Sequence, residues 1–152
     1  MKELAPDEKK LIDNISEYGW HVIQVEGDDT GPGFCYSVGL YETFQAPEIV
    51  VTGLPLDLAH EMINIMGDDI ASGMQYESGK YYSDIIENYQ CYMSKVDGSF
   101  YKDYFGYGIW YYKNETFPVL QCLYPSDDNV YPWDWTEDEQ MYQPVLSENK
   151  QE

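Results

Sequence analysis

The sequence contains no arginine: all eight of its basic residues are lysines, set against 28 aspartates and glutamates, and the formal net charge is −20. The planar guanidinium of arginine is the usual means by which proteins hold a phosphate or carboxylate at two points. A strongly negative chain without it is therefore poorly equipped to bind nucleic acid, anionic lipid or phosphorylated substrates. Its electrostatic field attracts cationic partners instead, and it speeds the encounter with them.

The acidic residues are concentrated in two stretches. Between Lys10 and Lys80 there is no further lysine or arginine but there are twelve acidic residues. From residue 127 to the end there are eight acidic residues and the single Lys150. Neither stretch can neutralise itself locally, and a positively charged partner would relieve the repulsion. Solubility of a solvated surface is the simpler explanation of the same pattern.

Long apolar runs and paired cysteines are also absent. No segment approaches the ~20 apolar residues that span a bilayer, and the N-terminal residues lack the apolar region of a signal peptide. The three cysteines, Cys35, Cys91 and Cys122, are widely spaced, form no C-x-x-C motif and have apolar neighbours. This pattern indicates buried, reduced thiols. We therefore expect a cytoplasmic protein that does not contact a membrane.

The composition predicts a folded chain in spite of its charge. Hydrophobic residues make up 43% and aromatic residues 16% of the sequence, whereas disordered acidic chains are poor in both. A length of 152 residues suits one domain. We expect a single domain over 1–152, with an N-terminal helix in 1–18, a core over 19–146 and a disordered tail over 147–152.

Hydrophobic periodicity and turn residues predict the order of the elements. An α+β fold follows, built on a mostly antiparallel sheet of about five strands with two or three flanking helices. The first two strands should form a hairpin around a long turn over 26–33. The predicted helices lie at about 6–18, 54–71 and 100–112, and the predicted strands at 20–25, 34–38, 48–52, 89–95 and 117–124.

Several short motifs follow one another in a familiar order. They are Gly19-Trp20, Gly31-Pro32-Gly33-Phe34, Tyr36-Ser37-Val38-Gly39-Leu40, Pro47-Glu48-Ile49-Val50-Val51, Gly53-Leu54-Pro55, Phe117-Pro118 with Gln121, Tyr131-Pro132-Trp133-Asp134, and Gln143-Pro144. Together they resemble the bacterial family named domain of unknown function 4262, over about 19–146. The resemblance implies a small cytoplasmic bacterial domain and brings no established reaction with it.

One position departs from the family pattern. Members often have His-Pro-Glu where this chain has Ala46-Pro47-Glu48. If that histidine is a base or metal ligand in relatives, this chain has lost it, because a methyl group cannot move a proton. The chain would then be an inactive, binding-only version. Otherwise the histidine is structural throughout the family.

Residues able to carry out chemistry at neutral pH are few. The two histidines are His21, on a predicted strand, and His60, on a predicted helix. His60 and Glu61 are adjacent and point in different directions on a helix, so they form no dyad. A zinc motif H-E-x-x-H would need histidine at position 64, which is Asn64. The paired aspartates in turns lack the spacing of a calcium loop. We predict no catalytic residue, no metal and no cofactor.

The glycine-rich turn before the second strand allows a small-molecule site. It is no phosphate-binding loop, because no G-K-[ST] follows it, and its glycines suit a backbone with positive φ or close approach. The alternative function is therefore a small enzyme or ligand-binding domain. Its pocket would involve Pro32, Gly33, Phe34, Tyr36, Ser37 and His60.

The C-terminal segment interleaves aromatic and acidic side chains. They are Asp127, Asp128, Tyr131, Trp133, Asp134, Trp135, Glu137, Asp138 and Glu139. Aromatic rings among carboxylates suit lysine- and arginine-rich proteins, through ion pairs and cation–π contacts. The tryptophans could instead cover the edge of the core.

The favoured function is therefore a non-enzymatic acidic protein that neutralises a basic protein partner. An immunity protein against a nuclease-like bacterial toxin fits best, because a nuclease needs a positive cleft. A DNA mimic that acts on a DNA-binding protein is a close variant, and a plain structural subunit is a third reading.

Overall fold

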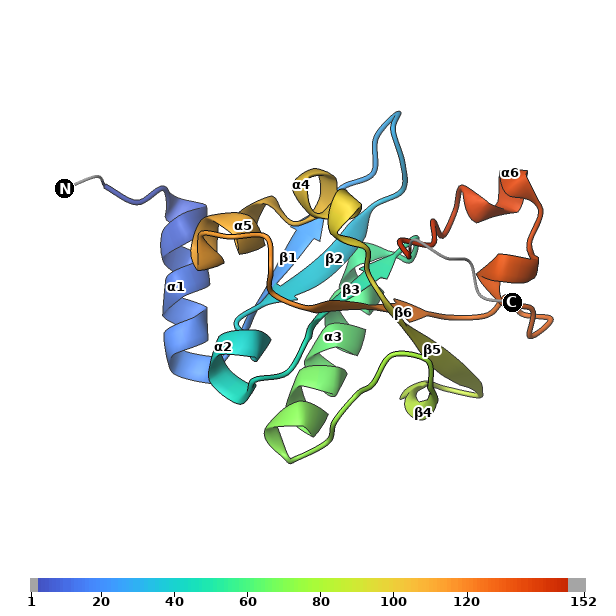
Figure 1. The fold of residues 1–152 in the computed structure, drawn as a ribbon, viewed down its shortest axis with the longest axis horizontal. Helices are drawn as coiled ribbons and strands as arrows, with labels where there is room; N and C mark the ends of the chain where they lie inside the picture. Colours follow the sequence, from blue (N-terminus) through green and yellow to red (C-terminus); the bar gives the residue numbers. More distant parts are fainter. Residues whose placement is uncertain (1–2, 148–152) are drawn as a thin grey trace.

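A computed structural model describes residues 3–147, so the tail predicted for 147–152 lies outside it except for Ser147. The core is one six-stranded sheet in the order β1-β2-β3-β6-β5-β4 (Figure 1). All neighbouring strands are antiparallel except β3 and β6, which are parallel. The strands are β1 (His21–Val25), β2 (Phe34–Val38), β3 (Glu48–Thr52), β4 (Tyr81–Ile86), β5 (Tyr89–Lys95) and β6 (Val119–Leu123).

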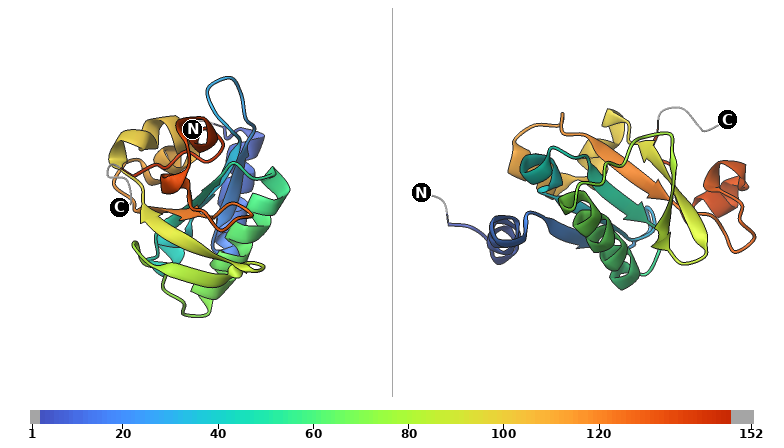
Figure 2. Two further views of the ribbon diagram at one scale, coloured as in Figure 1. Left: turned by 90° about the vertical axis from the view of Figure 1, so that its right-hand side faces the viewer. Right: turned by 90° about the horizontal axis from the view of Figure 1, so that it is seen from below.

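Helices cover both faces of this sheet, which confirms the predicted α+β class (Figure 2). The long α3 packs on one face, whereas α1, α4 and α5 pack on the other. The helices are α1 (Pro6–Tyr18), α2 (Leu40–Phe44), α3 (Leu56–Ala71), α4 (Tyr101–Tyr104), α5 (Gly106–Tyr112) and α6 (Glu137–Gln140). No helix within residues 3–147 is long and apolar enough to cross a membrane.

The central strands are buried along their whole length because both of their faces are covered. On β3, Ile49 and Val51 point toward α3 and join Met62 and Met66 of that helix. Val50 points to the opposite face, into the cluster that α1, α4 and α5 cover. The alternation of side chains along each strand thus feeds two separate cores.

The helix predicted over 100–112 is divided into α4 and α5 by Phe105. This residue leaves the helical conformation (φ −117°, ψ 45°), and its ring is fully buried. Three of the helices and strands were not predicted at all: α2, β4 and α6. The two helices have only five and four residues. Strand β4 contains a register shift and a positive φ at Asp84, which break the alternation of a regular strand.

The C-terminal segment is attached to the sheet by two buried glutamine side chains. Gln143 accepts a hydrogen bond from the amide of Tyr124 (3.0 Å) and donates to its carbonyl (2.9 Å), as a neighbouring strand would. Gln121 on β6 donates to the carbonyl of Pro144 (2.6 Å) and accepts from the amide of Leu146 (2.8 Å). These contacts fix the path of the chain beyond β6.

Candidate functional site

A groove of about 1060 Å³ separates the turn between β1 and β2 from the C-terminal segment. No lysine of the described chain lines it. Five carboxylates do, two from the turn and three from α6, so segments about one hundred residues apart contribute to one surface. We call this surface the acidic groove; its carboxylates belong to Asp28, Asp29, Glu137, Asp138 and Glu139.

Two of these carboxylates stabilise the backbone that carries them. Asp28 accepts hydrogen bonds from the amide (2.8 Å) and the hydroxyl (2.6 Å) of Thr30. Glu139 closes a capping box with Thr136, from whose amide (3.0 Å) and hydroxyl (2.9 Å) it accepts. In both cases the hydrogen bonds lower the pKa of the carboxyl, so the groove keeps these negative charges in mildly acidic solution.

The other three carboxylates of the groove are unpaired. Asp29, Glu137 and Asp138 are exposed, and their carboxylates make no hydrogen bond or ion pair with any described residue. Over residues 3–147 there are two ion pairs, Lys9 with Asp13 and Lys80 with Glu77, and neither borders the groove. The negative charge here is therefore free to attract a cation from outside the chain.

Apolar surface lies directly beside these charges. Met141 and Tyr142 line the groove and are 69% and 73% exposed, more than any other large hydrophobic residue described. Single exposed apolar side chains are common on protein surfaces, whereas methionine and tyrosine are enriched where proteins bind one another. Both residues lie beyond the segment for which the sequence predicted partner contacts, so sequence reasoning missed them.

The aromatic residues predicted to contact a partner mainly attach the C-terminal segment to the sheet. Tyr131 stacks on Trp133 at a ring distance of 5.0 Å, and Trp133 meets Tyr92 of β5 edge-on at 5.0 Å. The Trp135 indole donates to the carbonyl of Val130 (2.8 Å). Both tryptophans are half-buried, and only Trp133 also lines the acidic groove.

The remaining predicted acids, Asp127, Asp128 and Asp134, are exposed but lie outside the groove. The six residues of the alternative pocket do not share a cavity. Pro32 lines the acidic groove, with Gly33 next to it in the chain, but Phe34 and Tyr36 belong to the core. Ser37 is buried too, and its hydroxyl donates to a carboxylate (2.7 Å). His60 lies in a different cleft.

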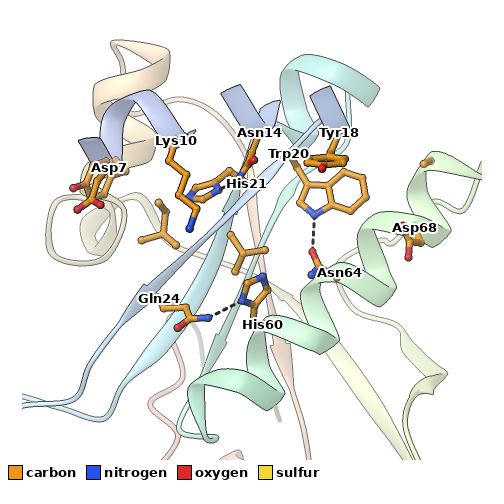
Figure 3. Close-up of a pocket in the computed structure, with 14 residues that line it drawn as sticks. Asp7, Lys10, Asn14, Tyr18, Trp20, His21, Gln24, His60, Asn64 and Asp68 are labelled. Carbon is orange, nitrogen blue, oxygen red and sulfur yellow. Dashed lines mark hydrogen bonds between the residues drawn. The ribbon is translucent and has the colours of Figure 1, made fainter. Parts of the chain in front are cut away.

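That second cleft, of about 810 Å³, runs along β1 between α1 and α3 and contains both histidines (Figure 3). Each imidazole is held by a carboxamide: Asn14 Nδ2 lies 2.8 Å from His21 Nδ1, and Gln24 Nε2 lies 2.6 Å from His60 Nδ1. Because an amide nitrogen can only donate, each Nδ1 accepts, and a neutral ring then carries its proton on Nε2.

The pKa of His21 lies below the ordinary histidine value. Burial is the main cause, and the positive charges of Lys10 and His60 add to it. His21 is thus a neutral imidazole at neutral pH. No described serine or cysteine lines this cleft, so it contains no Ser–His or Cys–His pair.

A fully buried carboxylate, Glu48, was also missed. It accepts hydrogen bonds from Ser37 Oγ (2.7 Å), from the Tyr112 hydroxyl (2.5 Å) and from three backbone amides at the start of α2. Burial raises its pKa, and these donors oppose the rise. An acidic residue at the start of an apolar, β-branched strand was the feature of the sequence that could have indicated it. Its role is structural, since it caps α2 in place of a residue of that helix.

Metal and thiol chemistry find no support in the described chain. Within residues 3–147 no group of three or more histidine, cysteine, aspartate or glutamate side chains is placed to hold a metal ion. All three cysteines are buried and unpaired. Burial raises the pKa of the Cys35 thiol to about 12, so it is not a reactive thiolate at neutral pH.

The family model described as "Domain of unknown function (DUF4262)" matches residues 14–137. The chain belongs to this family. The DUF4262 match confirms the resemblance that the motifs indicated, although it begins and ends earlier than 19–146. The match includes strand β1, which lines the second cleft, and three of the five groove carboxylates, Asp28, Asp29 and Glu137. Asp138, Glu139, Met141 and Tyr142 lie beyond it. Comparisons with curated proteins and with solved structures give no match.

Proposed function

We propose that this DUF4262 chain is a non-enzymatic protein that binds a basic protein partner through the acidic groove and neutralises it. The observation that supports the proposal is the meeting of five carboxylates, from the turn at 28–32 and from α6, in one groove without a described lysine. Repulsion between these like charges destabilises the folded chain, and a bound cationic partner would relieve that repulsion.

The neighbouring apolar residues add a second kind of contact. Met141 and Tyr142 can be buried by a partner that approaches the carboxylates. Tightly bound interfaces combine such a desolvated apolar centre with charged residues around it. The charges speed association, whereas the apolar contact slows dissociation.

The partner that fits this chemistry best is a nuclease-like toxin, with the present chain as its immunity protein in the bacterial cytoplasm. An enzyme that cleaves nucleic acid must itself carry a positive cleft to hold the phosphates. The closely spaced carboxylates of the groove, in a chain without arginine, can occupy that positive cleft. A basic DNA-binding protein would present a similar positive surface to this chain. A nuclease activity assay must therefore distinguish the two kinds of partner.

The test is capture of partners from a lysate of the host, followed by binding measurements at rising salt. The key variant combines Asp29→Asn, Glu137→Gln and Asp138→Asn. The matched control combines Glu17→Gln, Glu61→Gln and Glu115→Gln, three exposed acids outside the groove. Because both triples change the net charge equally, a difference between them reports the position of the charges.

We expect a lysine- and arginine-rich partner whose affinity falls with salt. The groove triple should bind it at least about tenfold more weakly, roughly 1.4 kcal/mol, and the control triple should bind within about threefold of the original chain. An equal loss of affinity in both triple variants would contradict binding through the acidic groove. A captured partner that cleaves DNA or RNA, and stops when this chain is added, supports the immunity role; a partner without that activity contradicts it.

A further inference from the structure

Strand β1 forms one edge of the sheet, and its outer side faces the cleft that contains the histidines. In a strand, every second residue directs its N–H and C=O away from the paired neighbour. Beyond its pairing with β2, the backbone of residues 21–25 makes no hydrogen bond with any described residue. These groups are therefore available to an added strand over about 17 Å, the length of five residues.

The opposite edge of the sheet is protected in a way that β1 is not. The pairing of β4 with β5 is interrupted between Tyr82 and Ile86, and Asp84 has a positive φ (71°). Such bulges twist an edge and prevent another strand from pairing with it. In contrast, β1 pairs in unbroken register with β2 over five residues and contains neither proline nor lysine.

Helices border the edge of β1 without covering it. One side of the cleft is a stripe of α1 with Asp7, Lys10 and Asn14, spaced by three and four residues. The other side is a stripe of α3 with His60, Asn64 and Asp68, spaced by four residues (Figure 3). The volume of about 810 Å³ between these stripes is open. A single extended chain can enter there, with alternate side chains toward α1 and α3.

The charged residues of the walls favour a positively charged occupant. The lining combines apolar side chains, such as Trp20 and Ile23, with carboxamides, imidazoles and carboxylates at the rim of the two helices. Two aspartates, Asp7 and Asp68, line the cleft against one lysine, Lys10. The net charge of −20 favours the same sign of occupant, and it disfavours a second copy of this chain.

We propose that the open edge of β1 binds an extended, lysine- or arginine-bearing segment of a partner protein as an added strand of the sheet. Backbone hydrogen bonds to β1 supply affinity, and the polar walls select the side chains. This surface shares no lining residue with the acidic groove, so the proposal stands independently of the function proposed above.

The test uses the peptide acetyl-(Lys-Thr)₄-amide, which alternates cationic and β-branched residues, against the full chain in 150 mM salt. Amide hydrogen exchange, followed by nuclear magnetic resonance, is the readout. Every second amide of β1 should exchange at least tenfold more slowly with the peptide bound. The matched control is the same peptide N-methylated at every residue, which keeps the charge but cannot donate from its backbone. It should give no protection.

Two variants of α3 locate the peptide. Asp68→Lys reverses a charge in the wall of the cleft, and Glu61→Lys makes the same change at an exposed position outside it. We expect Asp68→Lys to weaken peptide binding at least threefold more than Glu61→Lys does. Equal binding of both peptides would show simple charge attraction and overturn the proposal. Absence of binding, or protection confined to residues of the acidic groove, would overturn it as well.

Discussion

The hydroxyl of Ser37 on β2 donates a hydrogen bond of 2.7 Å to the carboxylate of Glu48 on the adjacent β3, in the interior of the protein. The same carboxylate accepts the amides of Gly39, Leu40 and Tyr41. One buried acid at the start of β3 thus connects the end of β2 to the start of α2. A buried carboxylate is tolerated because every donor around it is aimed at it.

Glu48→Gln is therefore expected to destabilise the protein by about 2–4 kcal/mol, because a buried backbone donor would lose its acceptor. Each oxygen of the Glu48 carboxylate accepts a hydrogen bond from at least one backbone N–H. In either orientation of the glutamine amide, its NH₂ group would therefore face a backbone N–H. Chemical denaturation measures the change. Glu61→Gln, at an exposed position of α3, is the control and should change the free energy of unfolding by less than about 0.5 kcal/mol. A loss below 1 kcal/mol for Glu48→Gln would contradict the structural role.

Local pattern predicted the strands that are buried along their whole length, at 34–38, 48–52 and, within the predicted 117–124, at 119–123. Apolar runs bounded by turn residues indicate such strands clearly. It did not predict α2, whose cap comes from Glu48 rather than from its own sequence. Nor did it predict β4, whose irregular pairing leaves no alternation. These elements depend on contacts that only the folded chain brings together.

The acidic groove shows the same limit. The exposure of the acids in 137–139 followed from composition, and the structure shows them exposed. Their meeting with Asp28 and Asp29 did not follow, because it depends on how Gln121 and Gln143 fix the path of the C-terminal segment. Both glutamines were noticed as parts of a motif, but a motif does not say which backbone a side chain will bind.

Gln143→Leu tests that attachment. The leucine keeps a similar volume but leaves the N–H and C=O of Tyr124 without partners, which should cost about 2–3 kcal/mol. The C-terminal segment should also become cleavable by a protease at lower concentrations than the rest of the chain. Gln140→Leu removes amide donations to two carbonyls at a half-buried position and should cost less than half as much. Equal costs would show that Gln143 has no special role.

Gly53→Ala should disturb the groove without altering any of its carboxylates. A Cβ at this position would lie 1.9 Å from the carbonyl oxygen of Tyr142, so the segment carrying Met141 and Tyr142 must move. Gly73→Ala is the matched control: its φ is also positive (106° against 86°), but a Cβ there meets nothing within 4 Å. We expect both variants to lose stability from backbone strain, and Gly53→Ala alone to bind a basic partner more weakly, by calorimetry. Unchanged binding by Gly53→Ala would separate Met141 and Tyr142 from the binding surface.

Gly67→Ala should destabilise α3 although alanine is the better helix former. The new Cβ would lie 2.6 Å from the indole of Trp20, and overpacking of this kind costs about 1–3 kcal/mol. That exceeds the gain in helix propensity of up to about 1 kcal/mol. Gly106→Ala, at the start of α5 with nothing within 4 Å, should be neutral or stabilising. Thermal unfolding followed by tryptophan fluorescence compares the two, and a stabilised Gly67→Ala would contradict the close packing of Trp20 on α3.

The titration of His21 reports the electrostatics of the cleft beside β1. Its folded pKa lies below 6.5, from burial first and then from Lys10 and His60, so the unfolded chain takes up the proton first as the pH falls. The corresponding stability is fully present above pH 6.5 and is lost as the pH falls from 6.5 through the lowered folded pKa. Removing the nearby positive charge by Lys10→Ala should raise the pKa of His21, and Lys9→Ala, one position away and paired with Asp13, should change it much less. The chemical shifts of the imidazole protons, measured against pH, give the pKa of His21 in each protein. A His21 pKa at or above 6.5 in the unaltered protein would contradict the arrangement of Lys10 and His21 in this cleft. An equal change of this pKa in both variants would contradict it as well.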